Sequence, residues 1–217
     1  MNTQDNKIKI LIADDHAIVR EGLKQIVAEE SDMIVLGEAE NSSQLFDLLN
    51  RNLYSIIILD INMPGRSGLD ALKDIKHLYP DLPVLVLSMY SEELYGIRAL
   101  RAGASGYLKK ASAPDELVSA IQKIVNGKKY ISPNLAEKLA DNLSDVQNRL
   151  LHESLSDREY QIMCLIASGK SAEEIAEDLS LSINTIYTYR NRILEKMSMK
   201  SNVELTQYAI QNKLIEI

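Results

Sequence analysis

Residues 55–60 read Ser-Ile-Ile-Ile-Leu-Asp, a short run of β-branched apolar residues that ends on a carboxylate. Three other stretches have the same form and end on polar side chains: 9–15, 83–88 and 105–110. Short apolar runs bounded by Gly, Pro or Asp are typical of buried parallel strands. Strand-like and helix-like stretches alternate five times between Lys7 and about Gly127. The alternation predicts an α/β domain with a five-stranded, doubly wound parallel sheet.

The pattern changes after Lys128. Residues 133–153 have an amphipathic spacing that predicts one helix, and no strand pattern follows it. Four short helical segments follow, broken at Ser-Gly and Ser-Leu-Ser sequences. We therefore predict an α/β domain over 1–128, a helical linker over 129–153 and an all-α domain over 154–217.

Composition narrows the class of protein further. The chain has 217 residues, 46% of them hydrophobic, so each domain can bury a core. Its first residues are polar, no apolar run approaches the ~20 residues of a membrane span, and Cys164 is the only cysteine. We expect a cytoplasmic protein without a membrane partner. The formal charge of −7 disfavours non-specific DNA binding, but residues 182–200 hold four basic residues against one glutamate.

Carboxylates gather where the predicted strands end. In an open parallel sheet, the crevice beyond the carboxyl ends of the strands is where ligands bind. Magnesium prefers oxygen ligands and takes one or two carboxylates besides water and phosphate oxygens. We expect Asp15 and Asp60 to bind Mg²⁺ directly, Asp14 to hold a coordinated water and the backbone carbonyl of Asn62 to add an oxygen.

The same crevice has the groups needed for phosphoryl transfer. Asp60 is the candidate nucleophile, because a carboxylate forms an acyl phosphate when cations neutralise the incoming oxygens. Lys110 is expected to supply a positive charge and Ser88 a hydrogen bond to a phosphoryl oxygen. Lys109 competes with Lys110 for this role, but we expect it on the other face of its strand. His16 is expected to begin a helix, with no metal role.

These stretches resemble a known family. Residues 7–127 resemble a response-regulator receiver domain, and the whole chain is similar to the NarL/FixJ (LuxR-type) response regulators of bacterial two-component systems. The matching stretches are Ile12-Ala13-Asp14-Asp15-His16, Leu59-Asp60-Ile61-Asn62-Met63-Pro64-Gly65, Leu87-Ser88 and Gly103-Ala104-Ser105-Gly106-Tyr107-Leu108-Lys109-Lys110.

The resemblance implies a flavodoxin-like fold and a role for each residue in the crevice. Asp60 would be phosphorylated by a partner histidine kinase, and Tyr107 would be the aromatic switch that turns inward when Ser88 moves toward the phosphate. The residues implied to form the magnesium pocket are Asp14, Asp15 and Asp60, and those implied to contact the phosphoryl group are Ser88 and Lys110. Many receivers have a proline after the lysine, whereas this chain has Ala111.

The C-terminal region has the pattern of a helix-turn-helix. Residues 173–179 and 183–197 read as two helices joined by Ser180-Leu181-Ser182, and Ser182 is positioned to cap the second helix. One face of that second helix is apolar. The opposite face is polar and comprises Asn184, Thr185, Tyr187, Thr188, Asn191 and Arg192. A helix-turn-helix places such a face in the major groove of DNA.

The resemblance extends over this region and assigns roles by position. It implies base contacts by Tyr187, Thr188 and Asn191 and phosphate contacts by Thr185, Arg192, Lys196 and Lys170, with Ser182 also in the DNA-binding set. The family often has histidine at position 189, where this chain has Tyr189. In relatives the last helix, here 203–214, makes a dimer contact, which implies a homodimer on phosphorylation.

We predict a transcription regulator in which phosphorylation of Asp60 controls dimerisation and sequence-specific binding to double-stranded DNA. Two alternatives stay open. An aspartyl phosphatase or phosphotransferase is suggested by Asp60-Ile61-Asn62, but position 62 lacks the second carboxylate that would act as general acid, so no turnover enzyme is expected. A phosphorylation-independent DNA-binding protein or protein-interaction module is disfavoured by the intact set of Asp14, Asp15, Asp60, Ser88 and Lys110.

Overall fold

The computed structural model describes residues 7–63, 67–90, 92–144 and 150–215. The chain forms two compact units, residues 1–136 and 137–217. Pro64 and Gly65, which belong to one of the stretches quoted above, lie outside the described residues, as do 145–149 of the predicted linker.

A five-stranded parallel sheet forms the centre of the first unit, as the sequence predicts. Its strands lie in the order β2-β1-β3-β4-β5. Their bounds are β1 Ile8–Ala13, β2 Met33–Ala39, β3 Ile56–Asp60, β4 Val84–Ser88 and β5 Gly106–Lys109. Every residue of β3 and β4 is buried, because helices cover both faces of the sheet.

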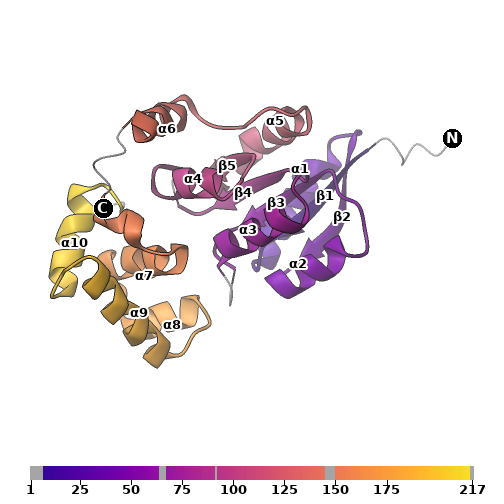
Figure 1. Cartoon of the computed structure of the whole chain (residues 1–217). Coiled ribbons are helices and arrows are strands. Elements are labelled where there is room, and N and C mark those ends of the chain that lie inside the picture. The colour runs from indigo at the N-terminus through magenta and orange to yellow at the C-terminus, as the bar shows by residue number, and fades with distance from the viewer. Residues whose placement is uncertain (1–6, 64–66, 91, 145–149, 216–217) are drawn as a thin grey trace. The chain divides into compact units, whose positions relative to one another are not determined.

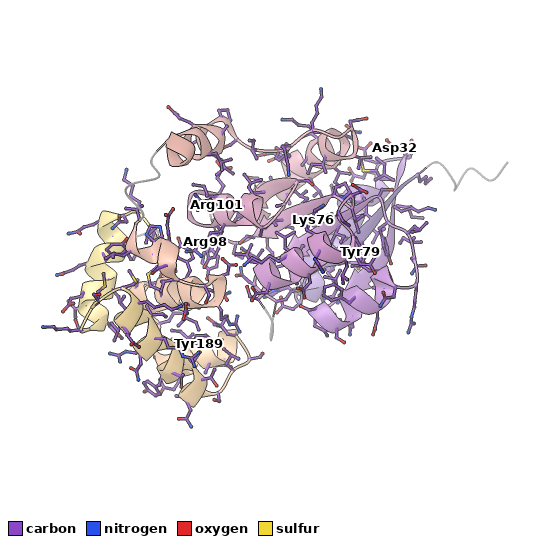
Figure 2. The ribbon with its side chains drawn as sticks, viewed as in Figure 1. Asp32, Lys76, Tyr79, Arg98, Arg101 and Tyr189 are labelled. Carbon is purple, nitrogen blue, oxygen red and sulfur yellow. The ribbon has the colours of Figure 1, made fainter. Side chains whose placement is uncertain are left out.

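Five helices cover the sheet, α1 and α5 on one face and α2, α3 and α4 on the other (Figure 1). Their bounds are α1 Ala17–Ala28, α2 Ser42–Leu49, α3 Gly68–Leu78, α4 Glu92–Arg101 and α5 Ala113–Val125, with a short 3-10 turn, η1, at Lys110–Ser112. Leu23 of α1 and Leu117 of α5 pack on Ile10, Ile12 and Ile58 in one buried cluster. Lys76 of α3, labelled in Figure 2, donates hydrogen bonds to the carbonyl oxygens of Pro80 and Leu82 and closes the loop into β4.

The start of the predicted linker docks on the edge of the sheet. The Tyr130 amide donates to the Ser105 carbonyl at 2.9 Å, and the Tyr107 amide donates to the Tyr130 carbonyl at 3.2 Å. Helix α6 (Pro133–Ser144) follows, and its Leu135 is buried. A Cβ atom added at Gly96 of α4 would lie 2.8 Å from a Leu135 methyl carbon, so this glycine permits the close approach.

The prediction of one helix over 133–153 is wrong in part. Helix α6 ends at Ser144 among the described residues, Leu150 has an extended backbone, and 3-10 helix η2 occupies Leu151–Ser154. The apolar spacing of the segment is helical, but a residue near its C-terminal end has a partner elsewhere in the second unit. His152 Nδ1 lies 3.0 Å from the Tyr208 hydroxyl, which fixes η2 within the second unit.

The second unit is all-α, as predicted, and is built around a buried helix. Its helices are α7 Asp157–Ala167, α8 Ala172–Asp178, α9 Ile183–Lys196 and α10 Asn202–Gln211. All residues of α7 are buried, and α9 and α10 both pack against α7. No helix among the described residues is long and apolar enough to cross a membrane.

Candidate functional site

Three carboxylates converge at the ends of β1 and β3. Asp60 is the last residue of β3, and Asp14 and Asp15 follow β1 directly. Asp14 and Asp60 are each only 1% exposed, while Asp15 is more open. One ligand atom from each of these residues and one from His16 lie within 4.8 Å of one another. The parallel register of β1 and β3 brings these groups together from positions far apart in the sequence.

Lys110, rather than Lys109, reaches into this acidic pocket. Its Nζ lies 2.7 Å from Asp60 Oδ2 and 2.6 Å from Asp14 Oδ2. Lys109 is the last residue of β5 and is only partly buried. The 3-10 turn η1 begins at Lys110, directly after the strand, with Ala111 in its middle. The strand end and the turn therefore direct the Lys110 ammonium to the two buried carboxylates.

Crowding in the pocket changes the ionisation of its members. Burial raises the pKa of Asp60 above its ordinary value; Lys110 acts against this rise, and the Asp14 charge adds to it. Burial acts to lower the pKa of Lys110, but the carboxylates of Asp60 and Asp14 outweigh it and raise that pKa. A lysine that stays charged beside a buried carboxylate can stabilise negative charge that develops on an incoming group.

Two carboxylate oxygens in the pocket are available to a cation. Asp14 Oδ2 and Asp15 Oδ1 are buried, and among the described residues neither accepts a well-directed hydrogen bond; Asp14 Oδ2 lies 2.6 Å from Lys110 Nζ, and Asp15 Oδ1 lies 2.9 Å from His16 Nδ1. Buried oxygens of this kind need a cationic partner. Oxygen ligands from three carboxylates fit Mg²⁺. His16 occupies the N-cap position of α1, as expected from the sequence, although its ring also lies against the acidic cluster.

Asn62 lies in the turn that follows β3. Its amide donates to Asp60 Oδ1 at 2.8 Å, so one oxygen of the candidate nucleophile is held by the backbone and the other by Lys110. This arrangement fixes the direction of the Asp60 carboxylate. The role of the Asn62 carbonyl as a ligand stays a prediction.

A chain of contacts leads from β4 to the edge of the sheet. Ser88, fully buried at the end of β4, accepts a hydrogen bond from the Tyr90 amide at 3.2 Å. Tyr107 of β5 is 2% exposed, and its hydroxyl donates to the Tyr90 carbonyl at 2.9 Å. Burial raises the pKa of Tyr107, so the hydroxyl keeps its proton as a donor. The Tyr107 ring is thus already inside the domain in this structure.

Arg20 supports the acidic pocket and was missed by reasoning from the sequence. It lies on α1, is 8% exposed and donates to the Asp14 carbonyl at 2.8 Å. The sequence does hold one indication of this role: Arg20 falls on the same face of α1 as the buried residues Leu23 and Val27. A charged residue on such an apolar face needs a partner.

The second unit presents the polar face of α9 that the sequence predicts. Ser182 caps the helix by accepting from the Thr185 amide at 3.1 Å, and its hydroxyl also lies 2.7 Å from the Thr185 hydroxyl. Tyr189, labelled on α9 in Figure 2, is half-buried beside the apolar stripe. The exposed predicted DNA-contacting residues are Lys170, Ser182, Tyr187, Thr188, Asn191, Arg192 and Lys196, and Thr185 is half-buried.

Some of the basic side chains near this face already have acidic or polar partners. Lys170 forms an ion pair with Asp178, and Lys196 Nζ lies 2.6 Å from Glu159 Oε2. Burial acts to raise the pKa of Glu159, but hydrogen bonds from Lys196 and Ser156 outweigh it and lower that pKa. At both lysines, a DNA phosphate would compete with the acidic partner already present.

Comparison with known families agrees with the two units. Residues 10–122 match the response regulator receiver domain, and residues 153–209 match the bacterial regulatory proteins of the luxR family. The chain is 35% identical over 210 residues to the response regulator GacA of Pseudomonas aeruginosa, which covers 96% of this chain and 98% of the relative. It is also 35% identical over 216 residues to the oxygen regulatory protein NreC of Staphylococcus carnosus, covering 96% of this chain and all of the relative.

Solved structures give the same result. RcsB from Salmonella enterica serovar Typhimurium, bound to the promoter rprA in the presence of the phosphomimetic BeF3−, is 28% identical to this chain, with a TM-score of 0.65. The match covers 94% of this chain and 98% of the RcsB chain. Another RcsB structure, from Salmonella typhimurium, has a TM-score of 0.68 at the same identity and covers 95% of this chain and 98% of its own.

Proposed function

Because the chain belongs to the LuxR-type response regulators of two-component systems, we propose that a partner histidine kinase phosphorylates Asp60 and thereby controls dimerisation and DNA binding. The observation that carries this proposal is the pairing of buried Asp60 with Lys110 beside two further aspartates. The protein acts on the chromosome and therefore in the cytoplasm.

The chemistry assigned to Asp60 is nucleophilic. As its Oδ atom bonds to phosphorus, the P–N bond of the phosphohistidine breaks and the imidazole leaves. Lys110, 2.7 Å from Asp60 Oδ2, offsets the charge that the phosphoryl oxygens bring into the buried pocket. The Ser88 hydroxyl donates to a phosphoryl oxygen once the group is attached. The Asn62 amide, bonded to Asp60 Oδ1, helps to orient the carboxylate for this reaction.

Asp14, Asp15 and Asp60 are the residues that would hold Mg²⁺, with the carbonyl of Asn62 as a fourth donor. The ion supplies a positive charge that neutralises phosphoryl oxygens. The two buried carboxylate oxygens without a directed hydrogen bond support this assignment. The three carboxylates would then bind the cation, and Lys110 would bind the phosphoryl group that Asp60 carries.

We assign the signal route to Ser88 and Tyr107. A Ser88 hydroxyl drawn toward a phosphoryl oxygen moves the β4–α4 loop, in which the Tyr90 carbonyl accepts from the Tyr107 hydroxyl. The backbone of Tyr107 is in turn bonded to Tyr130, where the linker begins. A shift at β4 therefore has a bonded path to the segment that leads to the DNA-binding domain.

The proposed DNA-binding surface is the exposed side of α9. Tyr187, Thr188 and Asn191 are assigned to base edges in the major groove. Phosphate contacts are assigned to Lys170, Thr185, Arg192 and Lys196, with Ser182 at the N-terminus of the helix. The local excess of basic residues supports this surface despite the acidic chain.

The proposed dimer contact uses α10 of a second copy of this chain. Leu205 and Ala209 of α10 are buried within the unit, whereas Val203 and Ile210 are 65% and 44% exposed. Apolar side chains on the outer side of α10 are available to a symmetry-related helix. Two copies would place two α9 helices on successive half-sites of the DNA.

Intact mass spectrometry tests the assignment of Asp60. We expect the full chain, incubated with Mg²⁺ and acetyl phosphate, to gain one phosphoryl group that Asp60→Asn does not gain. Removal of Mg²⁺ with a chelator should abolish the gain. Sustained release of phosphate from small phosphate esters would instead favour a phosphatase, and no gain with acetyl phosphate or a phosphorylated kinase would favour phosphorylation-independent DNA binding.

A further inference from the structure

Arg20 is a buried cation with three acceptors. Its side chain is 9% exposed, its Nη1 donates to the Asp14 carbonyl at 2.8 Å, and its Nη2 donates to Glu40 Oε1 at 2.6 Å. Its Nε lies 3.4 Å from Glu38 Oε2. A buried guanidinium is tolerated only when its donors are paired, and the planar fork suits acceptors in several directions. Arg20 therefore joins the β1–α1 loop to the acidic end of β2.

The backbone of Asp14 is held from two sides. Its amide donates to the Ala39 carbonyl at 3.0 Å, while its own carbonyl accepts from Arg20. The carbonyl that Arg20 binds belongs to the peptide unit between Asp14 and Asp15, so it sets the direction in which both side chains leave the chain. The Asp14 carboxylate is held in addition by the His16 amide at 2.8 Å.

We propose that Arg20 is a positioning residue for the acidic pocket. Its guanidinium is anchored by Glu38 and Glu40 and donates to the Asp14 carbonyl, and it thereby holds Asp14 and Asp15 in the arrangement that binds Mg²⁺. This inference rests on the proposed function of the pocket. Arg20 itself touches neither the cation nor the phosphoryl group. Its positive charge opposes cation binding, so a positional role and a purely electrostatic role predict opposite changes when the charge is removed.

Lys24 is a matched control for Arg20. It lies one turn further along α1, and its Nζ lies 3.1 Å from Glu38 Oε1 and 2.7 Å from Glu21 Oε2. It shares an acidic partner with Arg20, but it makes no bond to the β1–α1 loop among the contacts of the described residues. Lys24→Met removes one cation from the same network and leaves the Asp14 carbonyl bonded.

The test is the Mg²⁺ affinity of the unphosphorylated full chain, measured by isothermal titration calorimetry, together with hydrogen exchange of the amides at 13–16. We expect Arg20→Met and Arg20→Lys each to lose about tenfold in Mg²⁺ affinity and to exchange these amides faster. Lys24→Met should match the wild type in both measurements. Lysine keeps the charge but not the fork, so a parallel loss in Arg20→Lys assigns the effect to geometry.

Glu40→Ala covers the case in which the Arg20 variants do not fold. The Glu40 side chain is 58% exposed, so its removal spares the core, yet it takes away one anchor of the guanidinium. We expect a smaller loss of Mg²⁺ affinity in the same direction. The inference is overturned if folded Arg20 variants keep the wild-type Mg²⁺ affinity, or if Arg20→Met binds Mg²⁺ more tightly. If the Arg20 variants do not fold, unchanged Mg²⁺ affinity in Glu40→Ala overturns it. A wild-type chain that neither binds Mg²⁺ nor takes up a phosphoryl group contradicts the proposed function instead.

Discussion

At the scale of single residues, two buried carboxylates have opposite pKa shifts and opposite consequences for stability. Burial and the Asp14 charge raise the pKa of Asp60, although Lys110 opposes them. A carboxyl group with a raised pKa favours the folded state when protonated, and this contribution is lost as the pH rises through the folded-state pKa. The ionised nucleophile is therefore a cost to the fold at neutral pH.

Asp60→Asn should consequently unfold at a higher urea concentration than the wild type at about pH 7. The difference should shrink as the pH falls toward the raised pKa, because the wild-type carboxyl then becomes neutral as well. Urea unfolding midpoints measured over a series of pH values check this. A variant that is less stable than the wild type at neutral pH would contradict the account of the pocket.

The pKa of Glu159 is shifted in the opposite direction to that of Asp60. Burial acts to raise its pKa, but bonds from Lys196 and Ser156 outweigh burial and lower it. A depressed pKa contributes stability above the unfolded value, and this contribution is lost as the pH falls through the folded value. Glu159→Gln keeps an oxygen that can accept from the Ser156 amide but loses the negative charge that pairs with Lys196, so it should cost about 1 kcal/mol at neutral pH and much less in acid. Thermal unfolding at several pH values measures the difference; a pH-independent cost would contradict the assigned ion pair.

Tyr107→Phe tests the proposed signal route. The variant keeps the buried ring and loses only the hydroxyl that donates to the Tyr90 carbonyl. We expect phosphorylation of Asp60 to proceed at the wild-type level, while the effect of phosphorylation on DNA affinity is reduced. Intact mass and fluorescence anisotropy with labelled duplex report the two quantities separately. An unchanged DNA response would remove Tyr107 from the route.

At the scale of elements, the linker is anchored to the receiver where it begins. Leu135 of α6 is 1% exposed and packs against Gly96 of α4, while Tyr130 pairs with β5. Leu135→Ala should lower the free energy of unfolding by about 2–5 kcal/mol. Hydrogen exchange of the Tyr107 amide should accelerate with it, whereas Glu137→Ala, an exposed change on the same helix, should alter neither. If the Tyr107 amide of Leu135→Ala exchanges at the wild-type rate, α6 does not stabilise the pairing of Tyr130 with β5.

The elements themselves were largely predictable from the sequence. Strands such as Ile56–Asp60 are continuous apolar runs, and a parallel sheet must place their polar ends together, so the acidic pocket followed from local pattern. Arg20 did not, because its partners come from β2 and helical periodicity says nothing about them. The pair Lys196–Glu159 likewise joins residues 37 positions apart. The helix expected over 133–153 forms only in its first part, because η2 near the end of this segment is held by the contact of His152 with Tyr208, a residue far along the chain.

At the scale of the whole molecule, a receiver with a DNA-binding domain is useful only if phosphorylation changes the affinity for DNA. Thermodynamic linkage requires that the phosphorylated and unphosphorylated states bind DNA, or a second copy of the chain, with different free energies. Couplings of this kind typically change an affinity by about 5–150-fold. The duplex for the measurement is obtained by selection from a randomised library with the phosphorylated chain.

The affinity of the full chain for that duplex, with and without acetyl phosphate and Mg²⁺, tests the central claim most directly. We predict that phosphorylation changes the dissociation constant of the wild type by at least about fivefold, while Asp60→Asn shows no response to the phosphodonor. Fluorescence anisotropy at a fixed salt concentration measures both, since salt alone alters such affinities. Equal affinity in the two states, or an equal response in Asp60→Asn, would contradict control of DNA binding through Asp60.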